Sequence, residues 1–172
     1  ETKLMSIKKG DLLPDATLLC MTEEGPTEVT LSDHTKGQCV VLVGLPGPYT
    51  GTCTEAHVPS LLRVYDELKE NGVNKVICFS VSDPFVMKAF AESTGAEAAG
   101  IAMLADSAGE LTTKLGLGFD APAVGFYGRA IRHSMMVEDG VVQVLLFEEA
   151  HGACDLTAGE ALVDAISDFR AS

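Results

Sequence analysis

The sequence predicts an α/β fold with a mixed central sheet flanked by helices. Strand-like runs of β-branched residues alternate with segments whose apolar residues recur every three or four positions, a pattern typical of a largely parallel sheet. Near the C-terminus, two strand-like runs flank Glu138-Asp139-Gly140, which predicts an antiparallel hairpin and therefore a mixed sheet. The 172 residues contain no repeat and no linker, so we expect a single domain over residues 1–172.

The first half of the chain predicts three strands and one long helix. In order, these are strands at 16–21, 27–31 and 39–45 and a helix from about 53 to 71. The third run, CVVLVGL, is continuously apolar, as expected for a strand covered on both faces. Pro59 lies inside the helix and should kink or restart it. Gly72 is suited to end it.

The second half predicts four strands and three helices. These are strands at 73–81, 101–105, 131–137 and 141–147, and helices that begin near 84, 106 and 157. Asp83 should cap the first of these helices, with Pro84 in its first turn. Asp106 should cap the second, and Thr157 with Glu160 should form a capping box at the start of the last.

The charge of the chain excludes several classes of partner. There are 25 acidic and 12 basic side chains, and the formal net charge is −13. Binding to phosphate needs clustered Lys and Arg, so we expect neither nucleic acid nor an anionic membrane as a partner. The longest apolar run, residues 39–45, is too short to cross a bilayer. The pair Glu148-Glu149 is expected to lie on a solvated face.

The five cysteines indicate a reducing compartment. They occur at positions 20, 39, 53, 78 and 154. Their number is odd and no pair forms a CxxC motif, which argues against a disulfide framework. We therefore expect a cytoplasmic location, or a mitochondrial or plastid one if a transit peptide has been removed before Glu1. Cys20 and Cys39 lie in strand-like apolar runs and are expected to be structural.

Residues 46–53, PGPYTGTC, join the end of a buried strand to the start of a helix. In open α/β sheets ligands bind beyond the carboxyl ends of the strands. The unpaired N–H groups of a helix's first turn favour an anion and lower the pKa of a cysteine placed there. Cys53 is therefore predicted to be a nucleophile, and the alternative is a small cysteine that only packs. The Thr50 hydroxyl can bond the sulfur or a ligand, while Pro46 stiffens the loop and shields the thiolate.

The spacing Pro46-xxx-Thr50-xx-Cys53 resembles the active-site pattern of peroxiredoxins. The segments VGLPGPYTGTCTEAHVPSLL, GVNKVICFSVSDPFVMKAF and IRHSMMVEDGVV are similar to type II peroxiredoxins, the peroxiredoxin-five group. This resemblance implies a thioredoxin-like fold, a homodimer and a thiol-dependent peroxidase that reduces hydrogen peroxide and alkyl hydroperoxides without a metal or bound cofactor. The family usually has PGAFTP where this chain has PGPYTG.

The same resemblance implies roles for single residues. Cys53 would be the peroxidatic cysteine, and Thr50 would hydrogen-bond its thiolate and the peroxide. Pro46 would shield the site, and Arg132 would be the family's distant arginine. Independently of the family, a fixed guanidinium beside a thiolate lowers the thiol pKa and can hold a peroxide oxygen. Without the family, Arg132 would be one of four arginines and a surface strand residue.

Oxidised Cys53 would be a sulfenic acid, and a second thiol must reduce it. Three routes remain open. Thioredoxin, or glutathione with glutaredoxin, could reduce Cys53 directly. Cys154 lies in a polar stretch that matches the region of the resolving cysteine in atypical two-cysteine members. Cys78 matches a cysteine of plant-like members but lies in a predicted buried strand, where it would resolve Cys53 only after local unfolding.

The sequence leaves two alternatives to peroxidase activity at Cys53. Cys53 and His57 are four residues apart on a predicted helix, so they could form a metal pair or a nucleophile pair. No Cys or His cluster supplies further metal ligands, so we expect no metal and a locally bonded or packed His57. The remaining alternative is a redox sensor or binding protein that uses Cys53 as a switch, with one stoichiometric oxidation instead of sustained turnover.

Overall fold

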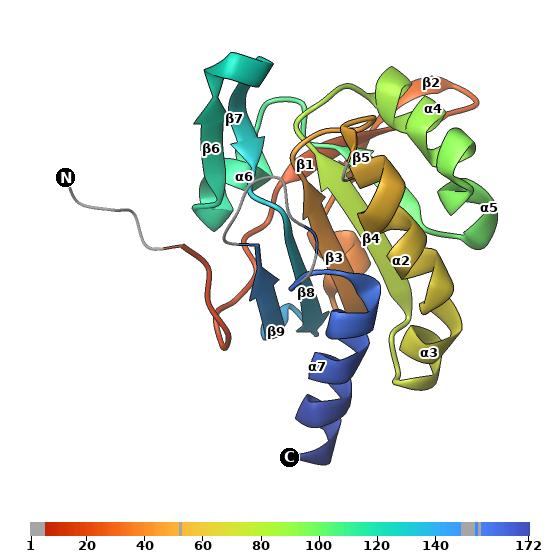
Figure 1. Ribbon diagram of the computed structural model, residues 1–172, viewed down its shortest axis with the longest axis vertical. Helices are drawn as coiled ribbons and strands as arrows, with labels where there is room; N and C mark the ends of the chain where they lie inside the picture. The colour runs from red at the N-terminus through yellow and green to blue at the C-terminus, as the bar shows by residue number, and fades with distance from the viewer. Residues whose placement is uncertain (1–5, 52, 149–153, 155) are drawn as a thin grey trace.

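The computed structural model describes residues 6–51, 53–148, 154 and 156–172, without the side chains of residues 53 and 54. Seven strands form one sheet in the order β2-β1-β5-β4-β3-β8-β9, and β6 and β7 form a separate pair (Figure 1). Strands β3, β4 and β5 run parallel, while the other neighbours are antiparallel, so the predicted mixed sheet is confirmed. The strands are β1 (Thr17–Thr22), β2 (Gly25–Thr30), β3 (Cys39–Leu45), β4 (Lys75–Ser80), β5 (Ala102–Ala105), β6 (Gly118–Ala121), β7 (Phe126–Ala130), β8 (His133–Glu138) and β9 (Val141–Phe147).

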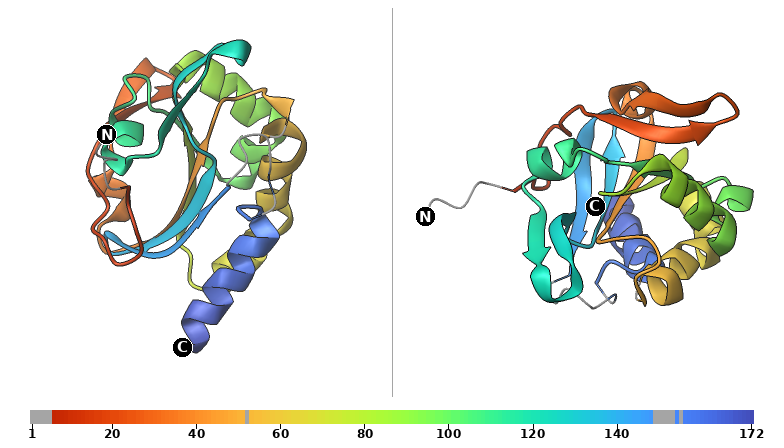
Figure 2. Two further views of the ribbon diagram at one scale, coloured as in Figure 1. Left: turned by 60° about the vertical axis from the view of Figure 1, so that its left-hand side comes forward. Right: turned by 90° about the horizontal axis from the view of Figure 1, so that it is seen from above.

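Helices cover both faces of the sheet (Figure 2). One face packs against α2, α4 and α7, and the other against α6 and the segment before β1. The helices are α1 (Ser32–Thr35), α2 (Val58–Arg63), α3 (Tyr65–Glu70), α4 (Pro84–Thr94), α5 (Ala96–Ala99), α6 (Glu110–Leu115) and α7 (Gly159–Ala171), with a π-turn η1 (Cys53–His57) and a 3-10 turn η2 (Pro122–Val124). None of the helices in the described ranges is long and apolar enough to cross a membrane.

Strand β3 divides the core in two. All seven of its residues are buried, as the unbroken apolar run predicts. Because side chains alternate between the faces of a strand, Val41 and Val43 join the cluster under α2, α4 and α7, whereas Val40 and Leu42 join the cluster under α6. The end of β3 is thereby held on both sides, and this rigid end carries the loop that leads to Cys53.

The predicted long helix from 53 to 71 is three consecutive pieces. The π-turn η1 ends at His57, and α2 begins at Val58 with Pro59 in its first turn. Pro59 therefore restarts the helix, since a proline is tolerated where its missing N–H has no partner to lose. A second interruption was not predicted: Val64, with φ −106° and ψ 9°, separates α2 from α3.

The predicted caps have mixed outcomes. Asp83 caps α4 by accepting a hydrogen bond from the Val86 amide, as predicted. Helix α6 begins only at Glu110, although the Asp106 carboxylate accepts hydrogen bonds from amides in its first turn. The capping box at the start of α7 was a wrong prediction. Thr157 bonds Glu148, nine residues earlier in the chain, and Glu160 pairs with Arg63 of α2.

Strands β6 and β7 are the largest element that the sequence reasoning missed. They form a hairpin over residues 118–130 with a register irregularity between Phe119 and Ala121. The hairpin stands at the same end of the molecule as the start of α4 (Figure 1). Its return strand, β7, leads directly to Arg132 and β8.

Candidate active site

The loop between β3 and η1 is tied to its surroundings and to itself. The Arg129 guanidinium, on β7, donates a 2.8 Å hydrogen bond to the carbonyl of Pro46. It also stacks on the Phe126 ring, 4.7 Å from the centroid. Thr50 Oγ1 donates to the carbonyl of Gly47 at 2.9 Å, so its hydrogen is used within the loop while its oxygen can still accept. These bonds give the predicted site loop a defined shape.

Tyr49 fixes the other side of this loop. Its backbone has φ +61°, a left-handed conformation that a non-glycine residue adopts at a cost. The Tyr49 hydroxyl accepts a hydrogen bond from Ser93 Oγ at 3.2 Å, and its ring meets Phe90 edge-on at 5.2 Å. Helix α4 therefore compensates for the backbone cost through a side chain that the sequence marked as atypical of the family.

Cys53 is the first residue of η1, directly before α2. Its predicted position at a helix start, just after a buried strand, is therefore confirmed by the backbone. Its side chain lies outside the described part of the structure. A π-turn is uncommon and occurs often at functional positions. His57 is the last residue of this turn, so its contacts show which segments pack beside the start of the helix.

Arg132 is not a surface residue. Its side chain lies just before β8 and is only 2% exposed. Its Nη1 lies 3.3 Å from Nδ1 of His57, so the structure brings the predicted arginine to the π-turn that begins at Cys53. The Arg132 Nε atom is buried and has no hydrogen-bond partner among the described residues. A buried N–H donor without a partner is costly and is well placed to serve a ligand.

His57 is fully buried and neutral. Burial and the charge of Arg132 lower its pKa to about 3, against the opposing effect of the Thr157 carbonyl. The His57 Nε2 atom lies 3.3 Å from Ser134 Oγ, and Ser134 donates to the Thr157 carbonyl at 2.7 Å. The expectation of a hydrogen-bonded His57 is therefore confirmed, but the bonds reach two separate segments, residues 132–134 and Thr157.

Glu148 corrects a second expectation. It was predicted to lie on a solvated face but is buried, 5% exposed. Its Oε2 accepts hydrogen bonds from both the amide and the hydroxyl of Thr157, each at 2.7 Å. A single carboxylate oxygen thus meets two donors from a segment that the sequence cannot pair with it. Glu149, the second residue of that prediction, lies outside the described residues.

His133, on the opposite face of β8 from Ser134, was not singled out from the sequence. Its Nδ1 bonds the Ile131 carbonyl at 2.7 Å, and its Nε2 is buried without a partner among the described residues. Burial lowers its pKa to about 4. The ring lies against Gly44, where a Cβ would overlap it, so the close approach requires glycine there.

The other cysteines occupy different environments. Cys78 is completely buried in β4, between Val43 of β3 and Met103 of β5. Cys154 is half-buried. Cys39 is buried 3.5 Å from the Arg170 guanidinium, and burial raises the pKa of its thiol. Cys20 is half-buried and packs against the core, as expected for a structural residue.

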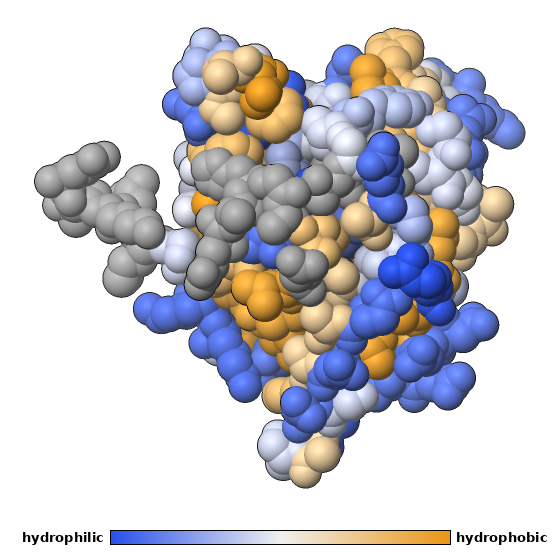
Figure 3. Space-filling view, in the orientation of Figure 1, coloured by the Kyte–Doolittle hydropathy of each residue, from blue (hydrophilic) through white to orange (hydrophobic). Residues whose placement is uncertain are grey.

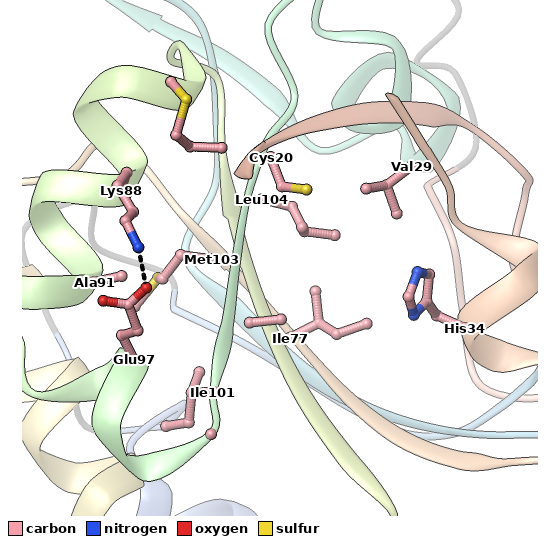
Figure 4. Close-up of a pocket in the computed structure, with 13 residues that line it drawn as sticks. Cys20, Val29, His34, Ile77, Lys88, Ala91, Glu97, Ile101, Met103 and Leu104 are labelled. Carbon is pink, nitrogen blue, oxygen red and sulfur yellow. Dashed lines mark hydrogen bonds and ion pairs between the residues drawn. The ribbon is translucent and has the colours of Figure 1, made fainter. Parts of the chain in front are cut away.

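A pocket of about 380 Å³ opens where β1 separates from β5, away from these residues (Figure 4). The two strands pair only at Leu19 and Ala105. Cys20 and His34 face the pocket from one side, and the ion pair between Lys88 and Glu97 lies on the other (Figure 4). None of the site residues predicted from the sequence lines it. No three His, Cys, Asp or Glu side chains in the described ranges are grouped to hold a metal ion.

The sequence predicts Pro46, Thr50, Cys53 and Arg132 as site residues, but it does not single out Arg129, Ser134 and Glu148, whose hydrogen bonds lie around them. One signal was available: Arg132 and Ser134 are two residues apart, so the strand period puts them on one face. The bond of Arg129 to Pro46 joins segments 83 residues apart, and that of Glu148 to Thr157 spans nine residues across a turn of the chain, so neither leaves a helix or strand pattern.

Comparisons with known proteins match most of the chain. A family model described as Redoxin matches residues 8–155. The chain is 37% identical over 169 residues to chloroplastic peroxiredoxin-2E-2 of Oryza sativa subsp. japonica, covering 96% of this chain and 75% of that protein. It is 40% identical over 140 residues to peroxiredoxin-2B of Arabidopsis thaliana, covering 80% and 85%.

Solved structures give the same picture. Reduced Prx3 of Vibrio vulnificus in complex with H2O2 superposes with a TM-score of 0.84 at 38% identity, covering 93% of this chain and 99% of that one. Peroxiredoxin 5 of Alvinella pompejana gives a TM-score of 0.81 at 28% identity, covering 94% and 99%. The thioredoxin-like fold expected from the sequence is therefore confirmed.

Proposed function

Because this chain belongs to the redoxin family and is a type II peroxiredoxin, a thiol peroxidase, we propose that Cys53 is the cysteine that peroxide oxidises. The Thr50 oxygen accepts a hydrogen bond from the peroxide at the reacting oxygen, and Pro46 limits the access of water. Arg132 supplies the positive charge. The single domain over residues 1–172 is part of the same proposal.

The buried Arg132 guanidinium is the observation that carries this proposal. It contacts the last residue of the π-turn whose first residue is Cys53. Its Nε has no described partner, so one N–H remains for a substrate oxygen. A guanidinium in a dry site stabilises both a thiolate and the negative charge that develops on a leaving oxygen.

The reaction has two halves. The Cys53 thiolate attacks one peroxide oxygen, so that a sulfur–oxygen bond forms while the oxygen–oxygen bond breaks. The sulfur is oxidised to sulfenic acid, and the leaving oxygen takes a proton from solvent to become water or an alcohol. A reducing thiol then displaces water from the sulfenic acid and forms a disulfide, and a second thiol releases reduced Cys53.

We propose that the reducing thiol comes from outside the chain, from thioredoxin or from glutathione with glutaredoxin. Complete burial between β3 and β5 argues against Cys78, because the sheet would have to open before two sulfurs could meet. Half-buried Cys154 is the internal competitor. Mass spectrometry after one equivalent of peroxide separates the routes: a Cys53–Cys154 linked peptide would contradict the external route, while a persistent sulfenic acid supports it.

We infer a homodimer formed through the end of the molecule that carries the site loop. Large apolar side chains are exposed there: Tyr49 52%, Phe85 64%, Val124 65% and Tyr127 66%. Figure 3 shows apolar surface at this end, over the β6–β7 hairpin and beside α4. Exposed large apolar side chains on one end of a molecule are typical of an interface. Light scattering should give twice the chain mass, and Phe85→Glu should yield a monomer; a monomeric wild type contradicts the inference.

The similar proteins narrow the cellular compartment only in part. Those of similar identity include chloroplastic and mitochondrial proteins, so we propose an organellar or cytoplasmic thiol peroxidase. Fractionation of cells that make the protein would decide between these locations.

The central experiment compares Cys53→Ser with Cys78→Ser and Cys154→Ser. With thioredoxin or glutathione and glutaredoxin, the first variant should lose sustained consumption of hydrogen peroxide, whereas the Cys78 variant should keep it. Full turnover by Cys53→Ser contradicts the proposed site. A single stoichiometric oxidation of the wild type, without turnover by any of these reductants, would favour a redox switch instead.

A further inference from the structure

Five residues from four separate segments form a closed ring of hydrogen bonds beside the site. Arg132 contacts His57 at 3.3 Å, His57 contacts Ser134 at 3.3 Å, and Ser134 donates to the Thr157 carbonyl at 2.7 Å. Thr157 donates its amide and hydroxyl to Glu148. The Glu148 amide closes the ring by donating to the Arg132 carbonyl at 3.1 Å. All five side chains are buried.

Two groups, the Arg132 guanidinium and the Thr157 carbonyl, determine which atoms donate in the contacts of His57 and Ser134. A guanidinium can only donate, so Nδ1 of His57 must accept from Arg132 and its single hydrogen must sit on Nε2. A backbone carbonyl can only accept, so Ser134 must donate to Thr157. The remaining contact then has one sense, in which His57 Nε2–H donates to the Ser134 oxygen. Neutral His57 is required for this arrangement, in agreement with its burial.

We propose that Ser134 is a positioning residue that orients the catalytic arginine through His57. The Ser134 oxygen holds the imidazole with its Nδ1 lone pair toward Nη1 of Arg132. This contact occupies one end of the guanidinium and leaves Nε–H without a described partner, available to the substrate oxygen. The inference rests on the proposed role of Arg132 at Cys53.

The bonds between Thr157 and Glu148 hold the Thr157 carbonyl, which accepts from Ser134, in a fixed position. Thr157 precedes α7 and would be free to shift if it were held only by its neighbours in the chain. Instead, its amide and hydroxyl both bind one buried carboxylate oxygen of Glu148, at 2.7 Å each. A hydrogen bond to a charged acceptor is stronger than a neutral one, so the Thr157 carbonyl presents a fixed target to Ser134.

The chain offers a matched control for Ser134 in Ser60. The Ser60 hydroxyl is also buried, donates to the His57 carbonyl at 2.6 Å and accepts from the Gly159 amide at 2.8 Å. It therefore links the same histidine to the same helix, but through the backbone and not through the imidazole. Ser60→Ala reproduces the structural loss of Ser134→Ala and leaves the imidazole in place.

The test combines turnover with a readout that needs no peroxide. Ser134→Ala should lower kcat/KM for hydrogen peroxide about fivefold, the worth of one buried hydrogen bond. It should raise the pKa of the Cys53 thiol, measured by thiolate absorbance. It should also shift the His57 imidazole and Arg132 Nε–H signals in proton–nitrogen correlation spectra. Ser134→Thr keeps the hydroxyl and should restore all three, and Ser60→Ala should change stability alone.

The proposal is overturned if Ser60→Ala and Ser134→Ala lower kcat/KM equally, or if Ser134→Ala leaves the imidazole and guanidinium signals unchanged. It is also overturned if those signals shift while turnover and the Cys53 pKa do not. The spectra can be recorded on Cys53→Ser, so a failure of the proposed peroxidatic role is recognised separately, by continued peroxide turnover in that variant.

Discussion

The two buried histidines predict a loss of stability in mild acid. His57 and His133 have their pKa values lowered by burial to about 3 and about 4, against 6.5 for the ordinary imidazole. At pH values between the folded and the unfolded pKa, the two imidazoles bind protons in the unfolded chain but stay neutral in the folded one. Stability is therefore complete above the unfolded pKa and falls as the pH drops below it toward the folded values.

The magnitude follows from the size of the interval. One pKa unit corresponds to about 1.4 kcal/mol, so lowering the pH to about 5 costs about 2 kcal/mol for each histidine and about 4 kcal/mol for both. Asp15, Glu110 and Glu160 have lowered pKa values and contribute only at more acid pH. Restricting the measurement to pH values above about 5 isolates the imidazoles.

The assay is urea unfolding followed by circular dichroism at about pH 7 and about pH 5, at constant ionic strength. The matched variant is His133→Phe, because the His133 ring packs on Phe79 and a phenyl ring can fill the same space. The Nδ1 bond to the Ile131 carbonyl is lost in this variant at both pH values alike. This variant should lose about 2 kcal/mol less than wild type between the two pH values. His34→Gln serves for comparison: partial burial and the charge of Lys75 also lower the pKa of His34, so this variant should shift the pH dependence in the same direction. An equal pH dependence in wild type and His133→Phe would refute the reasoning.

Three further outcomes test single contacts. Gly44→Ala should cost about 3 kcal/mol in urea unfolding, because a Cβ overlaps the His133 ring, and His133→Ala should recover part of that loss. Arg132→Lys keeps a charge but loses the planar fork, so kcat/KM for hydrogen peroxide should fall about a hundredfold; an unchanged value contradicts the proposed role. Arg129→Ala removes the bond to the Pro46 carbonyl, and proteolysis within the site loop should become faster than in wild type.

Most helices and strands of the fold could be predicted from local sequence patterns. The run of β3 fixes a buried strand by composition alone, and Asp83 before Pro84 marks a helix start through the chemistry of the cap. The β6–β7 hairpin escaped notice because residues 118–130 lack the apolar alternation of a half-buried strand and several of them are exposed. The break between α2 and α3 at Val64 could not be predicted, because neither proline nor glycine lies there.

The candidate site also contains residues that a local motif predicts and contacts that it does not. Pro46, Thr50 and Cys53 lie within eight residues and could be recognised from their order. The capping box failed because Thr157 has a stronger acceptor in Glu148, which the fold brings from the end of β9. A contact between two such segments depends on strand register and sheet order, neither of which a single local pattern contains.

The four arginines show how an acidic protein keeps positive charge at this site. Within the described ranges, two of them are neutralised on the surface by glutamates. These pairs are Arg63–Glu160 and Arg170–Glu138. Among the described residues, Arg129 and Arg132 form no ion pair; Arg129 donates to a backbone carbonyl oxygen and Arg132 to a neutral imidazole. A neutral acceptor orients a guanidinium without cancelling its charge, whereas a carboxylate would do both. Burial of His57 therefore has a consequence beyond its own pKa: because the imidazole stays uncharged, it neither adds to nor cancels the positive charge of Arg132 beside the last residue of η1.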